Sequence, residues 1–337
     1  MRLADASTGF SWNPVTDLDG MWAYPFMVNA FRAGAIVAVL AGCVGWFMVL
    51  RRQSFAGHTL SVVGFPGAAG ATLIGFSASA GYFGFCLAAA VVLAAVPRAG
   101  RPVDGSTGGG GGAVGGGAEA AVTGTIQAFL LGCGYLFVAL YKGFLNGVDS
   151  LLFGSFLGIT TDQVLVLLAV AAAALAVLAL IGRPLLFASA DPDVAAARGV
   201  PVGALNTVFL VLLGAAAAEV GQITGSLLVF ALLVMPAATA QTLTARPAAG
   251  LALSVAIALA VTWTGLITAY YSPYPIGFYV STFAFGAYVL ARAGSLAVAY
   301  GRGRTGGHGR TGDSGPGQGR EVLGAARVKA ARVEAAR

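Results

Sequence analysis

The chain has 337 residues, of which 58% are apolar and only 9% are charged, and its formal net charge is +6. Soluble domains carry about 25% charged residues, so this composition excludes an ordinary water-soluble enzyme. Repeated apolar stretches, each long enough to cross a hydrocarbon core of about 30 Å, indicate an all-α, polytopic transmembrane helical bundle. Their long Ala, Leu and Val runs exclude the alternating pattern of a transmembrane β-barrel.

Hydropathy predicts nine membrane spans, and eight spans remain an alternative because one apolar segment, 149–158, is too short to cross. The residues before the first span, 1–25, form an acidic leader without the basic region and cleavage site of a signal peptide, so we expect this first span to be retained. The predicted spans are residues 26–50, 58–77, 81–97, 124–141, 163–182, 203–219, 222–243, 248–270 and 278–292.

The charges between the spans predict how the chain is oriented. If every span crosses once, eight arginines fall on one side of the membrane, and the acidic leader, Asp149 and Glu219 fall on the other. The positive-inside rule therefore predicts an extracytoplasmic N-terminus and a cytoplasmic C-terminus in the cytoplasmic (inner) cell membrane. These arginines are Arg51, Arg52, Arg98, Arg101, Arg183, Arg198, Arg246 and Arg292.

Two segments outside the predicted spans have the composition of disordered chain. Residues 98–117 form a Gly-rich cytoplasmic linker within the permease domain, 26–292, and residues 293–337 form a basic, largely disordered cytoplasmic tail. The end of the tail either forms a basic helix on the anionic inner leaflet or stays solvated.

Several kinds of chemistry are missing from the sequence. The two lysines, Lys142 and Lys329, do not lie in a phosphate-binding loop, so we expect ATP hydrolysis to be carried out by a partner chain. The two histidines, His58 and His308, do not form a metalloprotease motif, and the three cysteines have no CxxC spacing. We therefore expect no catalytic residue, no permanently bound cofactor and no nucleic-acid partner.

The most structured cytoplasmic connection contains the sequence SADPDVAAARGVP. Asp191 is a suitable N-cap, Pro192 fits the first helical turn, Gly199 suits the position after the helix, and Pro201 prevents its continuation. The pattern predicts a short capped helix over Asp191–Gly199. Such a helix is either a plain connection or a handle on which a soluble partner pushes.

Four motifs in chain order resemble the signatures of the ABC-3 family of metal-ion permeases, the importers of zinc, manganese and iron. They are Gly45–Gly67 (GWFMVLRRQSFAGHTLSVVGFPG), Leu152–Ile159 (LFGSFLGI), Asp191–Val200 (DPDVAAARGV) and Gly225–Ala240 (GSLLVFALLVMPAATA). The resemblance implies a second permease copy in a homodimer, two copies of a separate ABC ATPase subunit, and an extracytoplasmic solute-binding protein. It also implies that the short cytoplasmic helix is the coupling helix to the ATPase, made of Asp191, Pro192, Asp193, Val194, Ala195, Ala196, Ala197, Arg198 and Gly199.

The chain departs from the family at the expected metal ligands. The family signature has an Asp and a His four residues apart, on one helical face along the transport path, where this chain has His58 and Val62. His58 is still a nitrogen ligand, and in a symmetric dimer two copies could face one another, but the hard carboxylate is gone. The alternative is a histidine that only packs near the cytoplasmic end of its span.

Other polar residues are weaker candidates. Ser61, one turn after the histidine, either adds an oxygen ligand or bonds to its own backbone. Glu219 and Asp149 are predicted at the outer mouth, to attract cations or contact the binding protein, although a residue such as Glu219 is also compatible with simple hydration. Pro236, with Thr239 one turn later, predicts a gate or hinge.

These features predict the membrane-spanning permease subunit of an ABC importer for a divalent transition metal, which is transported by alternating access. The missing Asp shifts the expected preference from the harder Mn²⁺ toward Zn²⁺. One alternative is a non-ABC secondary cation transporter or channel, which would need intramembrane carboxylates at mid-depth. The other alternative is a transport-inactive membrane scaffold with the same fold.

Overall fold

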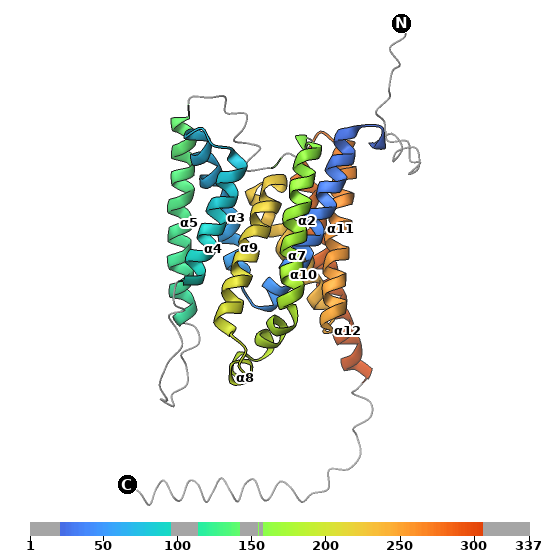
Figure 1. Ribbon diagram of the computed structural model, residues 1–337. Helices are drawn as coiled ribbons and strands as arrows, with labels where there is room; N and C mark the ends of the chain where they lie inside the picture. Colours follow the sequence, from blue (N-terminus) through green and yellow to red (C-terminus); the bar gives the residue numbers. More distant parts are fainter. Residues whose placement is uncertain (1–20, 96–113, 142–153, 155–157, 306–337) are drawn as a thin grey trace, which may run out of the picture. The chain divides into compact units, whose positions relative to one another are not determined.

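The computed structural model describes residues 21–95, 114–141, 154 and 158–305, and every regular element in these ranges is a helix (Figure 1). The chain divides into two compact units, Met1–Arg292 and Ala293–Arg337. The first unit carries all helices that concern the candidate site. The all-α prediction is confirmed for the described residues.

Nine long helices and one short one occupy the described ranges, and their bounds follow the predicted spans to within a few residues in most cases. Six of the long helices are long and apolar enough to cross a membrane, namely α2, α4, α7, α9, α11 and the first part of α12, so the prediction of eight or nine spans exceeds this number. The helices are α2 (Pro25–Leu50), α3 (Ser54–Leu73), α4 (Ala78–Ala95), α5 (Val114–Leu140), α7 (Thr161–Ala190), α8 (Pro192–Ala197), α9 (Val202–Thr224), α10 (Ser226–Leu243), α11 (Pro247–Tyr270) and α12 (Ile276–Thr305).

Local sequence signals explain several helix ends. Proline opens α2 and α11, where its missing N–H is not needed. Thr160 and Gln163 form a capping box at the start of α7. A single residue, Gly225, separates α9 from α10, and its φ of +78° is a backbone conformation that favours glycine.

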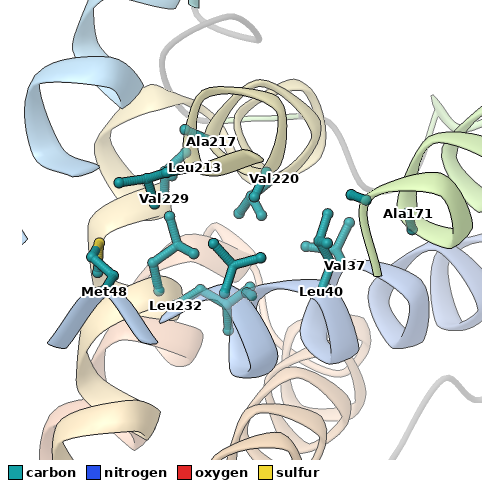
Figure 2. Packing of buried hydrophobic residues seen from close by; sticks show 14 of the residues in the cluster. Val37, Leu40, Met48, Ala171, Leu213, Ala217, Val220, Val229 and Leu232 are labelled. Atoms are coloured by element: carbon teal, nitrogen blue, oxygen red, sulfur yellow. The ribbon is translucent and has the colours of Figure 1, made fainter. Parts of the chain in front are cut away.

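The core of the first unit is built around α2, which packs against α7, α9, α10 and α11. Figure 2 shows aliphatic side chains from four of these helices meeting one another. These side chains belong to one continuous apolar core. The labelled side chains are Val37, Leu40 and Met48 of α2, Ala171 of α7, Leu213, Ala217 and Val220 of α9, and Val229 and Leu232 of α10.

Glycine allows three close helix contacts in this unit. A Cβ atom at Gly45 of α2 would collide with the carbonyl oxygen of Leu233 in α10. Tyr82 of α4 lies against Gly64 of α3 and Gly221 of α9, and a Cβ at either glycine would collide with the tyrosine ring. Small residues at such positions let helix backbones approach closely, as is common between membrane helices.

The structure changes two predicted segment boundaries. α5 begins at Val114, so the last residues of the predicted linker 98–117 are helical. α12 continues past Arg292 to Thr305, because the Ala- and Leu-containing sequence that follows the arginine favours helix. The rest of the linker, the rest of the tail and most of the leader 1–25 lie outside the described residues.

Candidate functional site

His58 lies in the second turn of α3 and is half-buried. Its ring borders a cavity of about 330 Å³ that is also lined by Ser54, Phe55 and Phe230. Phe230 of α10 approaches the imidazole edge to face, with 5.2 Å between the ring centroids. The candidate ligand therefore borders open space between two helices, and it is not enclosed in the core.

A short hydrogen-bonded chain fixes one side of the His58 ring. Nε2 of Gln127, in α5, lies 3.2 Å from Nε2 of His58, and Oε1 of Gln127 accepts a hydrogen bond from the Thr59 hydroxyl at 3.3 Å. Because the amide group donates to Nε2, this network assigns the proton of the neutral imidazole to Nδ1. The Nδ1 atom is buried, and no partner for it occurs among the described residues.

This arrangement limits how His58 can bind a cation. A metal ion needs a free imidazole lone pair, and the lone pair on Nε2 accepts from the Gln127 amide. An ion can take that position only if Gln127 withdraws or the ring turns. Within the described ranges, no group of three or more His, Cys, Asp or Glu side chains could hold a metal ion, and Val62 is buried with 6% of its surface exposed.

Ser61 does not contribute its hydroxyl group to this cavity. The hydroxyl donates to the carbonyl oxygen of His58 at 2.7 Å, and the Ser61 side chain is fully buried. The Ser61 carbonyl in turn accepts a hydrogen bond from the Tyr82 hydroxyl at 2.9 Å. Of the two predicted roles of Ser61, the structure shows the hydrogen bond to the backbone of its own helix. The Ser61 hydroxyl oxygen is therefore not directed at an ion beside His58.

The predicted hinge lies within α10. Pro236 is buried in the helix and has no N–H to offer to the carbonyl of Leu232, one turn earlier. The Thr239 hydroxyl donates to the Met235 carbonyl at 2.7 Å, so it does not replace the missing bond. The helix is therefore weakened at the level where its backbone touches Gly45 of α2.

The two acidic residues predicted at the outer mouth have different outcomes. Glu219 lies in α9 with none of its surface exposed, and neither carboxylate oxygen has a hydrogen-bond partner in the part of the chain that is described. The alternative prediction, a hydrated Glu219 at the membrane interface, is therefore wrong, because the helices around α9 cover this side chain. Asp149 lies outside the described residues.

The short helix predicted over Asp191–Gly199 is present as α8, Pro192–Ala197. The Asp191 side chain accepts hydrogen bonds from the backbone N–H groups of Asp193 and Val194, at 3.1 and 3.0 Å. Gly199 follows the helix with a φ of +82°, and Ala195 is buried in the core while its neighbours in α8 are exposed. The short helix lies at the ends of α7 and α9, which it connects (Figure 1).

Arg51, at the end of α2, joins the two helices that flank α8. Its guanidinium donates to the Ser189 hydroxyl near the end of α7 at 3.1 Å and to the Asn206 amide oxygen near the start of α9 at 3.0 Å. The same guanidinium lies over the Phe209 ring, 5.5 Å from its centroid. Gln53, in the turn before α3, also donates to Asn206 at 2.9 Å.

From the sequence, Arg51 was predicted only to lie on the cytoplasmic side, and no role was predicted for Gln127 or Asn206. A signal for both was available, since each is a polar side chain inside a predicted apolar span, 124–141 or 203–219. Polar side chains within membrane spans usually bond across helices or serve function.

The model of the ABC 3 transport family matches residues 23–109 and 114–295. The chain belongs to the ABC 3 transport family. It is a multi-pass membrane permease subunit of an ABC transporter.

Individual relatives agree with the family assignment. YfeC of Yersinia pestis, a chelated iron transport system membrane protein, is 32% identical over 257 residues, which cover 76% of this chain and 79% of YfeC. ScaB of Streptococcus parasanguinis, a manganese import system permease protein, is 27% identical over 223 residues, or 66% of this chain and 74% of ScaB. The fold matches PsaBC from Streptococcus pneumoniae, solved in complex with Fab, with a TM-score of 0.70 at 23% identity over 82% of this chain and 94% of that chain.

Proposed function

We propose that this ABC 3 permease imports a divalent transition metal by alternating access, driven by a separate ATPase subunit. The main support for the proposal is His58 of α3, whose ring borders a cavity and whose Nε2 is paired only with the neutral amide of Gln127 among the described residues. Intramembrane ionisable residues are expensive to maintain, and they commonly mark ion pathways. The relatives named for manganese and chelated iron support this class of substrate.

The complete transporter would contain two permease copies, two ATPase subunits and an extracytoplasmic solute-binding protein. Support for an ATPase docking site comes from α8, which is capped at both ends and exposed apart from Ala195. A rigid, exposed helix with one buried anchor can be pushed as a unit. The chain itself contributes no phosphate-binding motif.

Arg51 provides a physical route from the ATPase to the ion pathway. A displacement of α8 moves the end of α7 and the start of α9, which carry Ser189 and Asn206. Both residues accept hydrogen bonds from Arg51, which lies in the turn that connects α2 to α3. His58 follows in the second turn of α3, so motion of α8 is passed to the helix that carries it.

At the ion pathway, the cation would replace Gln127 as the partner of His58 Nε2. A single neutral imidazole is a borderline-soft ligand, and the position one turn later offers only the methyl groups of Val62. This donor set favours Zn²⁺ over Mn²⁺, whereas the relatives are named for manganese and iron. Two copies of His58 across a symmetric dimer would double the nitrogen ligands.

Metal accumulation in a strain that lacks this chain tests the proposal. We expect the cellular content of one metal among Zn, Mn and Fe to fall, and to recover when the wild-type chain is restored. Unchanged content of all three metals would support the transport-inactive scaffold. Recovery that persists when the partner ATPase carries an inactive nucleotide site would support the secondary transporter.

A further inference from the structure

Glu219 is the most anomalous buried residue in the described part of the membrane domain. It lies in α9 with 0% of its surface exposed, and both carboxylate oxygens are buried without a hydrogen-bond partner among the described residues. Its helix neighbours Ala217, Ala218 and Val220 are also fully buried. Among the described residues, the carboxyl group is therefore buried without a hydrogen bond that would compensate for the loss of water.

An ionised carboxylate in such a place is strongly unfavourable unless a positive charge neutralises it. Two states avoid this cost, a protonated acid and a carboxylate bound to a cation. A purely structural role for the residue needs only the first state. A transport role needs the second state, or exchange between the two.

Features around Glu219 favour a cation as the occupant. Gln222 follows three residues later, on the same face of α9, and its amide nitrogen is also buried without a partner in the described ranges. If the Gln222 amide group rotates by 180°, its oxygen takes the place of the nitrogen. Glu219 and Gln222 can then offer a carboxylate and a carbonyl oxygen together. Gln222 also lies in the last turn of α9, before the break at Gly225, where the helix carries partial negative charge.

We propose that Glu219, together with Gln222, binds a hard divalent cation such as Mn²⁺ within the membrane domain. Oxygen ligands suit such ions, which complete their coordination with water. The inference rests on the proposed function, because it makes α9 the source of the hard ligand that α3 lacks at His58 and Val62. Glu219 and Gln222 would form a second binding site for the transported ion, on a different helix from His58.

The test measures the melting temperature of the purified permease in lipid nanodiscs, with and without MnCl₂. We expect Mn²⁺ to raise the melting temperature of the wild-type protein. Glu219→Gln should melt higher than wild type without metal, because it removes a buried acid, and its Mn²⁺-dependent rise should be lost. Glu219→Asp keeps the charge and should retain part of the rise.

Thr262→Val is the matched control. The Thr262 hydroxyl in α11 is likewise buried and without a partner among the described residues, so its removal should raise the melting temperature and leave the Mn²⁺ response unchanged. An unchanged Mn²⁺ response in Glu219→Gln would overturn the inference. No Mn²⁺ response in wild type, with Glu219→Gln melting higher, would also overturn it, because Glu219 is then only a protonated acid.

Metal uptake by the assembled transporter separates this inference from the proposed function. If the wild-type transporter imports none of Zn²⁺, Mn²⁺ and Fe²⁺, the proposed function fails and this inference fails with it. If the wild type imports metal and Glu219→Gln imports it equally well, only the inference about α9 fails. We expect Mn²⁺ uptake by Glu219→Gln to fall at least tenfold.

Discussion

Arg51 and His58 lie at opposite ends of one short stretch of chain, and the structure treats them differently. Both terminal NH₂ groups of Arg51 donate to partners on other helices, and its guanidinium lies over an aromatic ring. His58 has one nitrogen bonded to Gln127 and one buried nitrogen without a partner among the described residues, beside a cavity. Hydrogen bonds from a charged guanidinium across helices stabilise a fold, whereas a single weak bond from a neutral amide beside open space can be exchanged for a ligand.

The contrast implies opposite responses to substitution. Changes at the Arg51 junction should lower stability first, and transport should fall because the helices that flank α8 are no longer held together. Changes at His58 should leave stability nearly unchanged and remove transport directly. Stability and transport must therefore be measured on the same variants.

The largest stability effect is expected for Arg51→Leu. The substitution leaves Ser189 and Asn206 without their charged donor, and a hydrogen bond to a charged group contributes about 1.5–3 kcal/mol. We expect the free energy of unfolding in mixed micelles to fall by about 2–4 kcal/mol. Arg52→Gln is the control: this exposed neighbour also carries a charge, and its substitution should change stability by less than about 0.5 kcal/mol.

A smaller and local effect is expected for Asp191→Ala. The loss of an N-cap costs about 1 kcal/mol, so the amides of Asp193 and Val194 should exchange with solvent about fivefold faster. Stimulation of the partner ATPase should fall with the order of α8. Asp191→Asn keeps a capping oxygen and should behave like wild type, and equal exchange rates in all three proteins would show that the cap does not hold α8.

The smallest stability effect is expected for Gln127→Leu, which should cost less than about 1 kcal/mol because it removes weak, half-buried hydrogen bonds. The variant frees Nε2 of His58, so the affinity of the purified permease for Zn²⁺ should rise. Thr59→Val removes only the other partner of Gln127 and should leave Zn²⁺ affinity unchanged. If Gln127→Leu binds Zn²⁺ more weakly than wild type, Gln127 is itself a ligand.

Local signals made most of the helices and α8 predictable. Apolar runs predicted the long helices. The ends of α8 were predictable because the residues that begin and end it, Asp191, Pro192 and Gly199, lie within a few residues of one another. The polar partners were not predictable in the same way, since His58 and Gln127 are 69 residues apart, and Arg51 and Asn206 are 155 apart. The burial of Glu219 likewise depends on which helices pack around α9, which periodicity in one helix does not reveal.

The most direct test of the central claim is metal uptake by the reconstituted transporter, normalised to folded protein, for wild type, His58→Ala and His58→Asp. If His58 binds the transported ion, His58→Ala should abolish uptake while stability changes little. His58→Asp should then restore uptake with preference moved toward Mn²⁺, because carboxylate oxygen suits harder cations. Uptake by His58→Ala within twofold of wild type, with His58→Asp less stable than His58→Ala, would contradict the account and identify His58 as a packing residue.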